Sequence, residues 1–257
     1  MTRITGVIAS GETGRARIFW IGAERLLAQL SRVTVFCGGY GSGKTEVAVN
    51  FALALAAVGH RVRLADLDIV NLYFRSREVR DVLRAHGVEV LVPAEPLLRA
   101  DTPVVPPEVK GAVEESGGFV VLDVGGDPVG ARILAGMATS VTETDYSNLF
   151  VVNSRRPFTD TAEKTTRLIA EIGRVSGVPV TATVVNSHLI DETTTATIQE
   201  GIELARAVEQ GSGIGISFVT VEERMLGSFD AAGCGYPVLV LSRLLLKPWE
   251  EGGANRK

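Results

Sequence analysis

The stretch "VFCGGYGSGKTEVAV", Val35–Val49, decides the fold of this chain. An apolar run ends at Cys37, a glycine-rich loop follows, and the residues after Lys44 have the composition of a helix. The eight residues from Gly38 to Thr45 fit the pattern G-x-x-x-x-G-K-[ST], in which backbone amides surround phosphate oxygens. Glycines allow the close approach, and the helix that follows adds the positive end of its dipole. The motif therefore predicts a phosphate-binding loop between a strand and a helix.

The residue types in this loop have distinct expected roles. Lys44 would bridge the β- and γ-phosphates, and the Thr45 hydroxyl would ligate Mg²⁺. The alternative is a glycine turn beside a surface lysine, but the preceding strand and a helix that ends in glycine fit the motif's context better. We expect the nucleotide to contact Gly39, Tyr40, Gly41, Ser42, Gly43, Lys44, Thr45 and Glu46.

Short apolar runs alternate with helix-length segments along the rest of the chain. Many runs are continuously apolar, which is typical of strands buried on both faces of a sheet. The alternation implies strand–helix–strand crossovers, so we predict an α/β, doubly wound, mostly parallel sheet with helices on both faces, in one domain spanning 1–257. The predicted strands are 33–37, 61–66, 88–92, 118–123, 147–153, 180–186, 215–220 and 237–242, and the predicted helices are 44–58, 74–86, 159–175 and 193–210.

Two segments do not follow this alternation. Residues 1–31 form an N-terminal extension whose first sixteen residues are polar and glycine-bearing, so we expect them to be loosely held. Its second half, 19–31, has leucines at helical spacing and predicts a short helix. Half of the ten prolines fall in 93–107, so we interpret that stretch as a loop or an insertion and not a regular element, and we assign 93–117 to a proline-rich loop or insertion. A connector is favoured there over a lid or a partner-binding loop.

Bulk composition excludes several classes of function. The chain is 46% hydrophobic and 22% charged, as expected for a globular protein, and its net charge of -4 gives no basic footprint for nucleic acid. No apolar run reaches the ~18 residues that span a bilayer, and the start does not resemble a secretory signal. Two cysteines and three scattered histidines predict neither a disulfide framework nor a zinc site. We therefore expect a cytoplasmic protein.

Acidic residues close two of the predicted strands. Asp66 and Asp68 end one strand, and Asp123 ends another, just before Gly125 and Gly126. Because ligands bind at the carboxyl edge of a parallel sheet, these carboxylates could support Mg²⁺ through water, orient an attacking water or accept its proton. The alternative is that the aspartates only cap backbone groups at strand ends.

Asparagines close two further strands, Asn153 and Asn186. An asparagine offers the donor and acceptor that a purine base requires, although neither segment reads N-K-x-D. Arg155 or Arg156 could reach a phosphate as an arginine finger, or both could be solvated at the strand end.

The order of these motifs resembles the SIMIBI-class P-loop NTPases, and most closely the CobQ/CobB/MinD/ParA group of nucleotide-binding domains, over residues 33–240. The resemblance implies MgATP binding. It also implies, position by position, Lys44 and Asp68 as catalytic residues, Thr45, Asp66 and Asp123 around the metal, and Asn186 as the adenine reader.

The chain departs from that group at Gly39. Many members dimerise face to face on ATP, and an extra lysine at this position then reaches the partner's site. A homodimer stays possible here, with an arginine such as Arg156 in place of the lysine. A membrane-binding C-terminal helix is not expected, because Pro248 interrupts the apolar residues at the end of the chain.

We expect a slow ATPase that acts as a nucleotide switch on a protein partner or assembly. One alternative is a small-molecule kinase or ligase resembling dethiobiotin synthetase, with an acceptor pocket built from 73–80 or 93–107. Arg75, Arg77 and Arg80 could serve it, or form a solvated helix face. Another alternative is a scaffold that binds ATP without hydrolysing it. A metallochaperone GTPase is disfavoured by the lack of a histidine and cysteine cluster.

Overall fold

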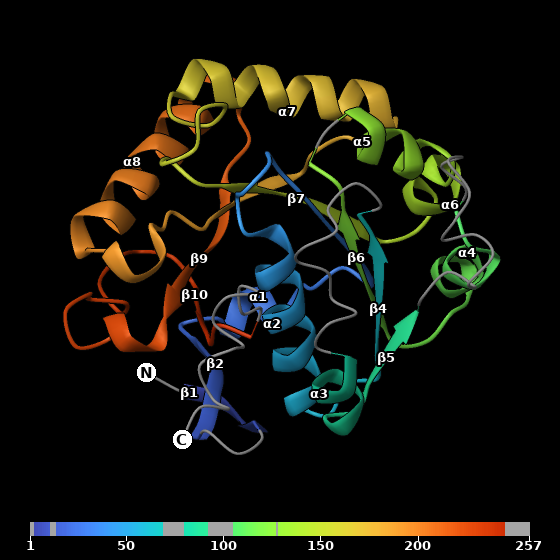
Figure 1. The fold of residues 1–257 in the computed structure, drawn as a ribbon. Coiled ribbons are helices and arrows are strands. Elements are labelled where there is room, and N and C mark those ends of the chain that lie inside the picture. Colours follow the sequence, from blue (N-terminus) through green and yellow to red (C-terminus); the bar gives the residue numbers. More distant parts are fainter. Residues whose placement is uncertain (1–2, 11–13, 69–79, 92–104, 127, 245–257) are drawn as a thin grey trace, which may run out of the picture.

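The computed structural model describes residues 3–10, 14–68, 80–91, 105–126 and 128–244, and Figure 1 shows their arrangement. Their strands form one sheet in the order β1-β2-β10-β9-β8-β7-β3-β6-β4-β5. These strands are β1 Arg3–Ser10, β2 Gly14–Ile21, β3 Val33–Cys37, β4 Val62–Leu67, β5 Val88–Leu91, β6 Phe119–Val124, β7 Tyr146–Val152, β8 Ala182–Val185, β9 Ile216–Glu222 and β10 Val238–Leu241.

Helices cover both faces of the sheet (Figure 1). The P-loop helix α2 packs on one face, while α4 and α5, then α7, then α8 pack on the other. The helices are α1 Glu24–Ala28, α2 Lys44–Ala57, α3 Arg80–Ala85, α4 Pro107–Glu114, α5 Pro128–Ala135, α6 Ala138–Thr142, α7 Ala162–Ser176 and α8 Thr195–Ser212.

The pairing of the strands confirms the predicted fold class. From β10 through β5 each pair of neighbours is parallel, and only the pairs β1–β2 and β10–β2 are antiparallel. Every residue of β3 and β4 is buried, as expected for strands covered on both faces. On the α2 face an aromatic cluster fills the core, with Trp20 and Phe218 in edge contact at 5.1 Å between ring centroids.

The predicted elements agree closely with the observed ones. All eight predicted strands occur, and α2, α7 and α8 lie within two or three residues of their predicted bounds. Of the predicted helix 74–86, the segment Arg80–Ala85 is helical and the remainder falls mostly outside the described residues. The segment 73–79 and most of 93–107, proposed for an acceptor pocket, also lie outside them, as does Pro248. None of the described helices is both long and apolar enough to cross a membrane.

The prediction for the N-terminus was wrong for the start of the chain, although the predicted short helix does occur within 19–31. Instead of a loosely held segment, β1 and β2 form an antiparallel hairpin that adds to the edge of β10. Ile18, Phe19 and Trp20 lie in β2 and are almost fully buried. Aromatic and β-branched residues such as these favour strands whose surface is packed. Only Glu24–Ala28 is helical.

The prediction of a loop or insertion over 93–117 was also wrong at its end, where a helix forms. Helix α4 occupies Pro107–Glu114 and packs Val109 and Val113 against the sheet. Pro107 is the first helical residue, where the missing proline N–H leaves no hydrogen bond unmade. The helix start was therefore missed because it lies in a proline-rich sequence.

Candidate functional site

The glycine-rich loop connects β3 to α2 at the carboxyl edge of the sheet. Gly43 immediately precedes α2 with a left-handed φ of 83°, and a Cβ at this position would collide with the side chain of Asn186. Gly126 packs against the backbone of Gly38, so a side chain there would also clash. The loop is therefore held closely by the ends of β6 and β8.

Lys44, the first residue of α2, is buried against carboxylates. Its Nζ lies 2.7 Å from Oδ2 of Asp68, and the two side chains are only 7% and 4% exposed. Burial alone would lower the pKa of Lys44, but Asp123, Asp68 and Asp66 together outweigh it and hold the pKa above its ordinary value. Lys44 is therefore charged, and its charge is balanced by aspartates.

The register of the sheet brings two predicted metal-site residues together. Asp66 on β4 is paired directly with Asp123 on β6. Asp123 is fully buried, and neither carboxylate oxygen accepts a hydrogen bond of normal geometry within the described residues. Burial raises the pKa of Asp123 to about 7, although Lys44 and the nearby Thr45 hydroxyl act in the opposite direction.

These residues fit a Mg²⁺ ion that is shared with a nucleotide. Among the described residues, no group of three or more His, Cys, Asp or Glu side chains has the geometry of a protein-only metal site. Mg²⁺ usually takes one or two protein oxygens together with phosphate oxygens and water. The Thr45 hydroxyl and the unbonded oxygens of Asp123 are suited to such a partial set.

A cavity of about 370 Å³ opens beside the loop, between α2 and the ends of β8, β9 and β10. Ile190, Ile198, Val221, Met225 and Leu241 contribute apolar wall, and a small number of polar groups face the same space. Apolar walls with few polar groups are typical of sites for small organic ligands. Of the predicted nucleotide contacts, the cavity is lined by Tyr40, Gly41, Gly43, Lys44, Thr45, Glu46 and Asn186.

The two asparagines at strand ends have different surroundings. Asn186 donates from Nδ2 to the Ser42 carbonyl at 2.8 Å and accepts from the Thr220 hydroxyl at 2.5 Å, so it ties the loop to β9. One N–H and one lone pair of this amide have no hydrogen-bond partner among the described residues. Asn153 is fully buried, and its amide hydrogen-bonds the backbone of Arg155 and His188. Asn153 therefore joins two loops and does not line the cavity.

Glu46 contacts the segment that follows β10. Its Oε1 accepts the Leu244 amide at 2.7 Å and Nδ2 of Asn50 at 3.1 Å. Asn50, which is fully buried in α2, exchanges two hydrogen bonds with the backbone of Ser242. The end of the described chain is thus fixed to the P-loop helix. Asn50 was not predicted from the sequence because its partner is the backbone of a distant residue, which no motif indicates.

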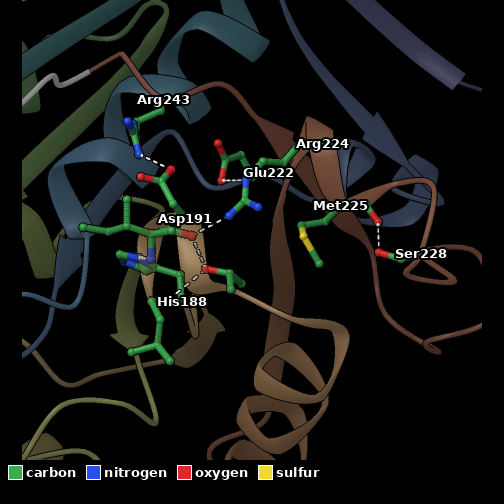
Figure 2. A network of polar contacts seen from close by, with 10 residues as sticks. His188, Asp191, Glu222, Arg224, Met225, Ser228 and Arg243 are labelled. Carbon is green, nitrogen blue, oxygen red and sulfur yellow. Dashed lines mark hydrogen bonds and ion pairs between the residues drawn. The ribbon is translucent and has the colours of Figure 1, made fainter. Parts of the chain in front are cut away.

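A network of polar contacts, shown in Figure 2, includes Glu222 and Arg243 of the cavity wall. Arg224 donates to the carbonyl of Ile190 and from Nε to Glu222 at 2.8 Å. Arg243 lies 3.1 Å from Asp191. Ile190 has a φ of 55°, the one positive value among the described residues other than glycine. Such a conformation is strained for a β-branched residue, so the network holds this wall of the cavity in place.

His188 follows β8, belongs to this network (Figure 2) and lines the cavity. Burial, with smaller effects of the Arg156 and Arg243 charges, lowers the pKa of His188 to about 4. Its Nδ1 accepts the Ile190 amide at 3.4 Å, which assigns the ring proton to Nε2. The site therefore contains a neutral imidazole at physiological pH.

The two neighbouring arginines of the predicted finger diverge. Arg155 forms an ion pair with Glu200 on α8 and does not line the cavity. Arg156 turns to the loop, where its Nε donates to the Gly41 carbonyl at 2.8 Å. Tyr40, between the glycines, has 75% of its surface exposed.

Residues 33–219 match the family model described as the CobQ/CobB/MinD/ParA nucleotide binding domain. Among solved structures, FtsY from Mycoplasma mycoides is similar at 18% identity and a TM-score of 0.52, with 74% of this chain and 60% of that chain covered. FtsY from Elizabethkingia anophelis, in complex with GDP, is similar at 16% identity and a TM-score of 0.50, with 75% and 58% covered. The chain thus spans about three fifths of these FtsY structures, and the likeness shows a shared fold. No curated protein sequence gives a significant match.

Proposed function

Because the chain belongs to the CobQ/CobB/MinD/ParA nucleotide-binding domain family, we propose that it binds MgATP and hydrolyses it slowly, as a switch acting on a protein partner. The proposal is supported by the loop, the buried lysine, the strand-end aspartates and the adjoining cavity. Together these supply phosphate contacts, metal support and space for a base in one continuous site.

The observation that carries the proposal is the buried contact between Lys44 and Asp68. A triphosphate would replace Asp68 as the partner of Lys44, since it carries more negative charge than the carboxylate. Its oxygens also accept hydrogen bonds from the loop amides. Asp68 would then lose its contact with Lys44 and face the attacking water. The phosphate-bound and phosphate-free forms would thus differ in what Lys44 binds, and a nucleotide shifts a conformational equilibrium through such a differential contact.

The residues then divide the chemistry among themselves. Lys44 and the loop amides would neutralise the charge on the β- and γ-phosphates. Thr45, Asp66 and Asp123 would hold Mg²⁺, which supplies polarisation of the phosphoryl oxygens when bound. Asp68, released from Lys44, would orient the attacking water and accept its proton at the carboxylate.

The choice of base rests on fewer groups. The free N–H and lone pair of Asn186 suit the donor and acceptor edge of adenine, so ATP is the proposed nucleotide. The FtsY structure from E. anophelis is a complex with GDP, which makes GTP the competitor to test.

Two assays test this function. Calorimetric titration with ATP, ADP and GTP, with and without Mg²⁺, measures binding, and release of inorganic phosphate measures turnover. We expect MgATP to bind more tightly than MgGTP, and phosphate release to be slower than about 1 s⁻¹, the low end of typical enzymes. Equal or better binding of GTP would overturn the choice of base. Binding without any turnover would favour a scaffold, and ADP formation without free phosphate would favour a kinase.

A further inference from the structure

Arg156 is a cation in the nucleotide cavity that forms no ion pair within the described part of the protein. The other lining cations are paired, Lys44 with Asp68 and Arg243 with Asp191. Arg156 makes its one hydrogen bond from Nε, and within the described part of the chain its terminal nitrogens have neither a hydrogen bond nor an ion pair. Arg156 therefore faces the cavity without a bonded anion among the described residues.

The backbone of the loop fixes the position of this guanidinium. Nε of Arg156 donates to the Gly41 carbonyl at 2.8 Å, and the guanidinium lies against the space that a Gly41 side chain would fill. Gly41 and its neighbours in the loop are the residues whose amides face a bound phosphate. Arg156 is thus attached to the loop of its own chain, with both terminal amino groups left to bind a ligand.

We propose that Arg156 binds the polyphosphate of the nucleotide within its own chain. A half-buried guanidinium without a counter-ion is costly, and phosphate oxygens match its planar pair of donors. The phosphates are the strongly anionic part of the ligand, whereas base and ribose carry no charge. This inference rests on the proposed function, since it takes the cavity to be the nucleotide's.

The neighbouring residue provides a matched control. Arg155 has the same side chain at the same strand end, but its charge is paired with Glu200 outside the cavity. The test compares Arg156→Gln, Arg156→Lys and Arg155→Gln with the parent. The Gln side chain keeps an N–H donor for the Gly41 carbonyl but has no charge. The Lys side chain keeps the positive charge but lacks the planar pair of donors of the guanidinium.

Affinities for adenosine, ADP and ATP are measured by calorimetry, and folding of each variant is checked by thermal denaturation. We expect Arg156→Gln to weaken ADP and ATP binding about 10- to 100-fold and to leave adenosine unchanged. Arg156→Lys should recover part of the loss, and Arg155→Gln should bind like the parent. The loss should be equal at protein concentrations that differ 100-fold, since the contact lies within one chain.

Three results would overturn the inference. They are parent-like ADP and ATP affinities in Arg156→Gln, an equal loss for adenosine, and a loss that appears only at high protein concentration. The first would leave the proposed function standing if the parent binds ATP. A parent that binds no nucleotide at all would overturn both.

Discussion

Replacing Asp68 by Asn tests whether the protein and the nucleotide compete for Lys44. In the structure Lys44 Nζ lies 2.7 Å from Asp68 Oδ2, and both side chains are nearly inaccessible. The substitution keeps the shape and removes the negative charge, so the buried ammonium loses its closest counter-ion. The nucleotide-free protein should become less stable, and the triphosphate should no longer have to displace a carboxylate.

The magnitude follows from the burial of the pair. Removing one partner of a buried ion pair costs about 3–5 kcal/mol. Asp123 and Asp66 still balance part of the Lys44 charge, and the amide oxygen introduced by Asp68→Asn still accepts a hydrogen bond, so about 2–3 kcal/mol is expected here. If ATP binding removes half of this destabilisation, the binding free energy becomes more favourable by that amount. ATP affinity then rises roughly tenfold, since about 1.4 kcal/mol is a factor of ten.

Urea denaturation measures the stability of the variant, and calorimetry measures its affinity for ATP. Phosphate release measures turnover, and the variant should have none. Asp191→Asn is the control for stability alone, because its exposed pair with Arg243 should be worth less than about 1 kcal/mol. An Asp68→Asn protein that is as stable as the parent, or that binds ATP more weakly, would refute the competition.

Three further predictions concern the metal site, the cavity wall and the N-terminal hairpin. The pKa of Asp123 is about 7 in the fold against 3.8 ordinarily, so its ionised form opposes folding, and the stability of the nucleotide-free parent should fall as pH rises from about 4 to 7. Asp123→Asn should flatten that decline and be more stable at pH 8, by up to about 4 kcal/mol in urea denaturation; an unchanged pH profile would contradict this. Ile190→Gly should relieve the strained backbone and raise stability by about 1 kcal/mol, while ATP binds more weakly; unchanged affinity would remove Ile190 from the site. Trp20→Ala should cost about 3–5 kcal/mol because the ring packs between Phe51 and Phe218 in the core, and a loss below about 1 kcal/mol would mean that the hairpin is not part of it.

The sequence predicted the parallel core well because its strands are buried on both faces and read as continuous apolar runs. The loop motif also placed Lys44 and Thr45 at the start of a helix, since the motif itself encodes the turn from strand to helix. The pairing of Asp66 with Asp123 follows from two strands that are adjacent in the sheet, although 57 positions in the chain separate them. Strand order was not predicted from the residues, so only the family resemblance indicated that these two aspartates share a site.

Other parts of the site depend on contacts between distant segments. The walls of the cavity come from 186–198 and 220–243, where no local motif marks a ligand. Arg155 and Arg156 are equivalent in the sequence, and only packing sends one to Glu200 and the other to Gly41. The N-terminal hairpin was missed because glycines and polar residues obscured an edge strand.

Equilibrium binding of MgATP to a Lys44→Ala variant tests the central claim most directly. Lys110→Ala is the matched control, since this lysine is half exposed on α4 and is paired with Glu114. With folding verified by circular dichroism, Lys44→Ala should lose triphosphate affinity by about 100-fold or more, on the order of 3 kcal/mol for a charge-assisted contact, and Lys110→Ala should match the parent. Parent-like MgATP binding by a folded Lys44→Ala protein would contradict the account.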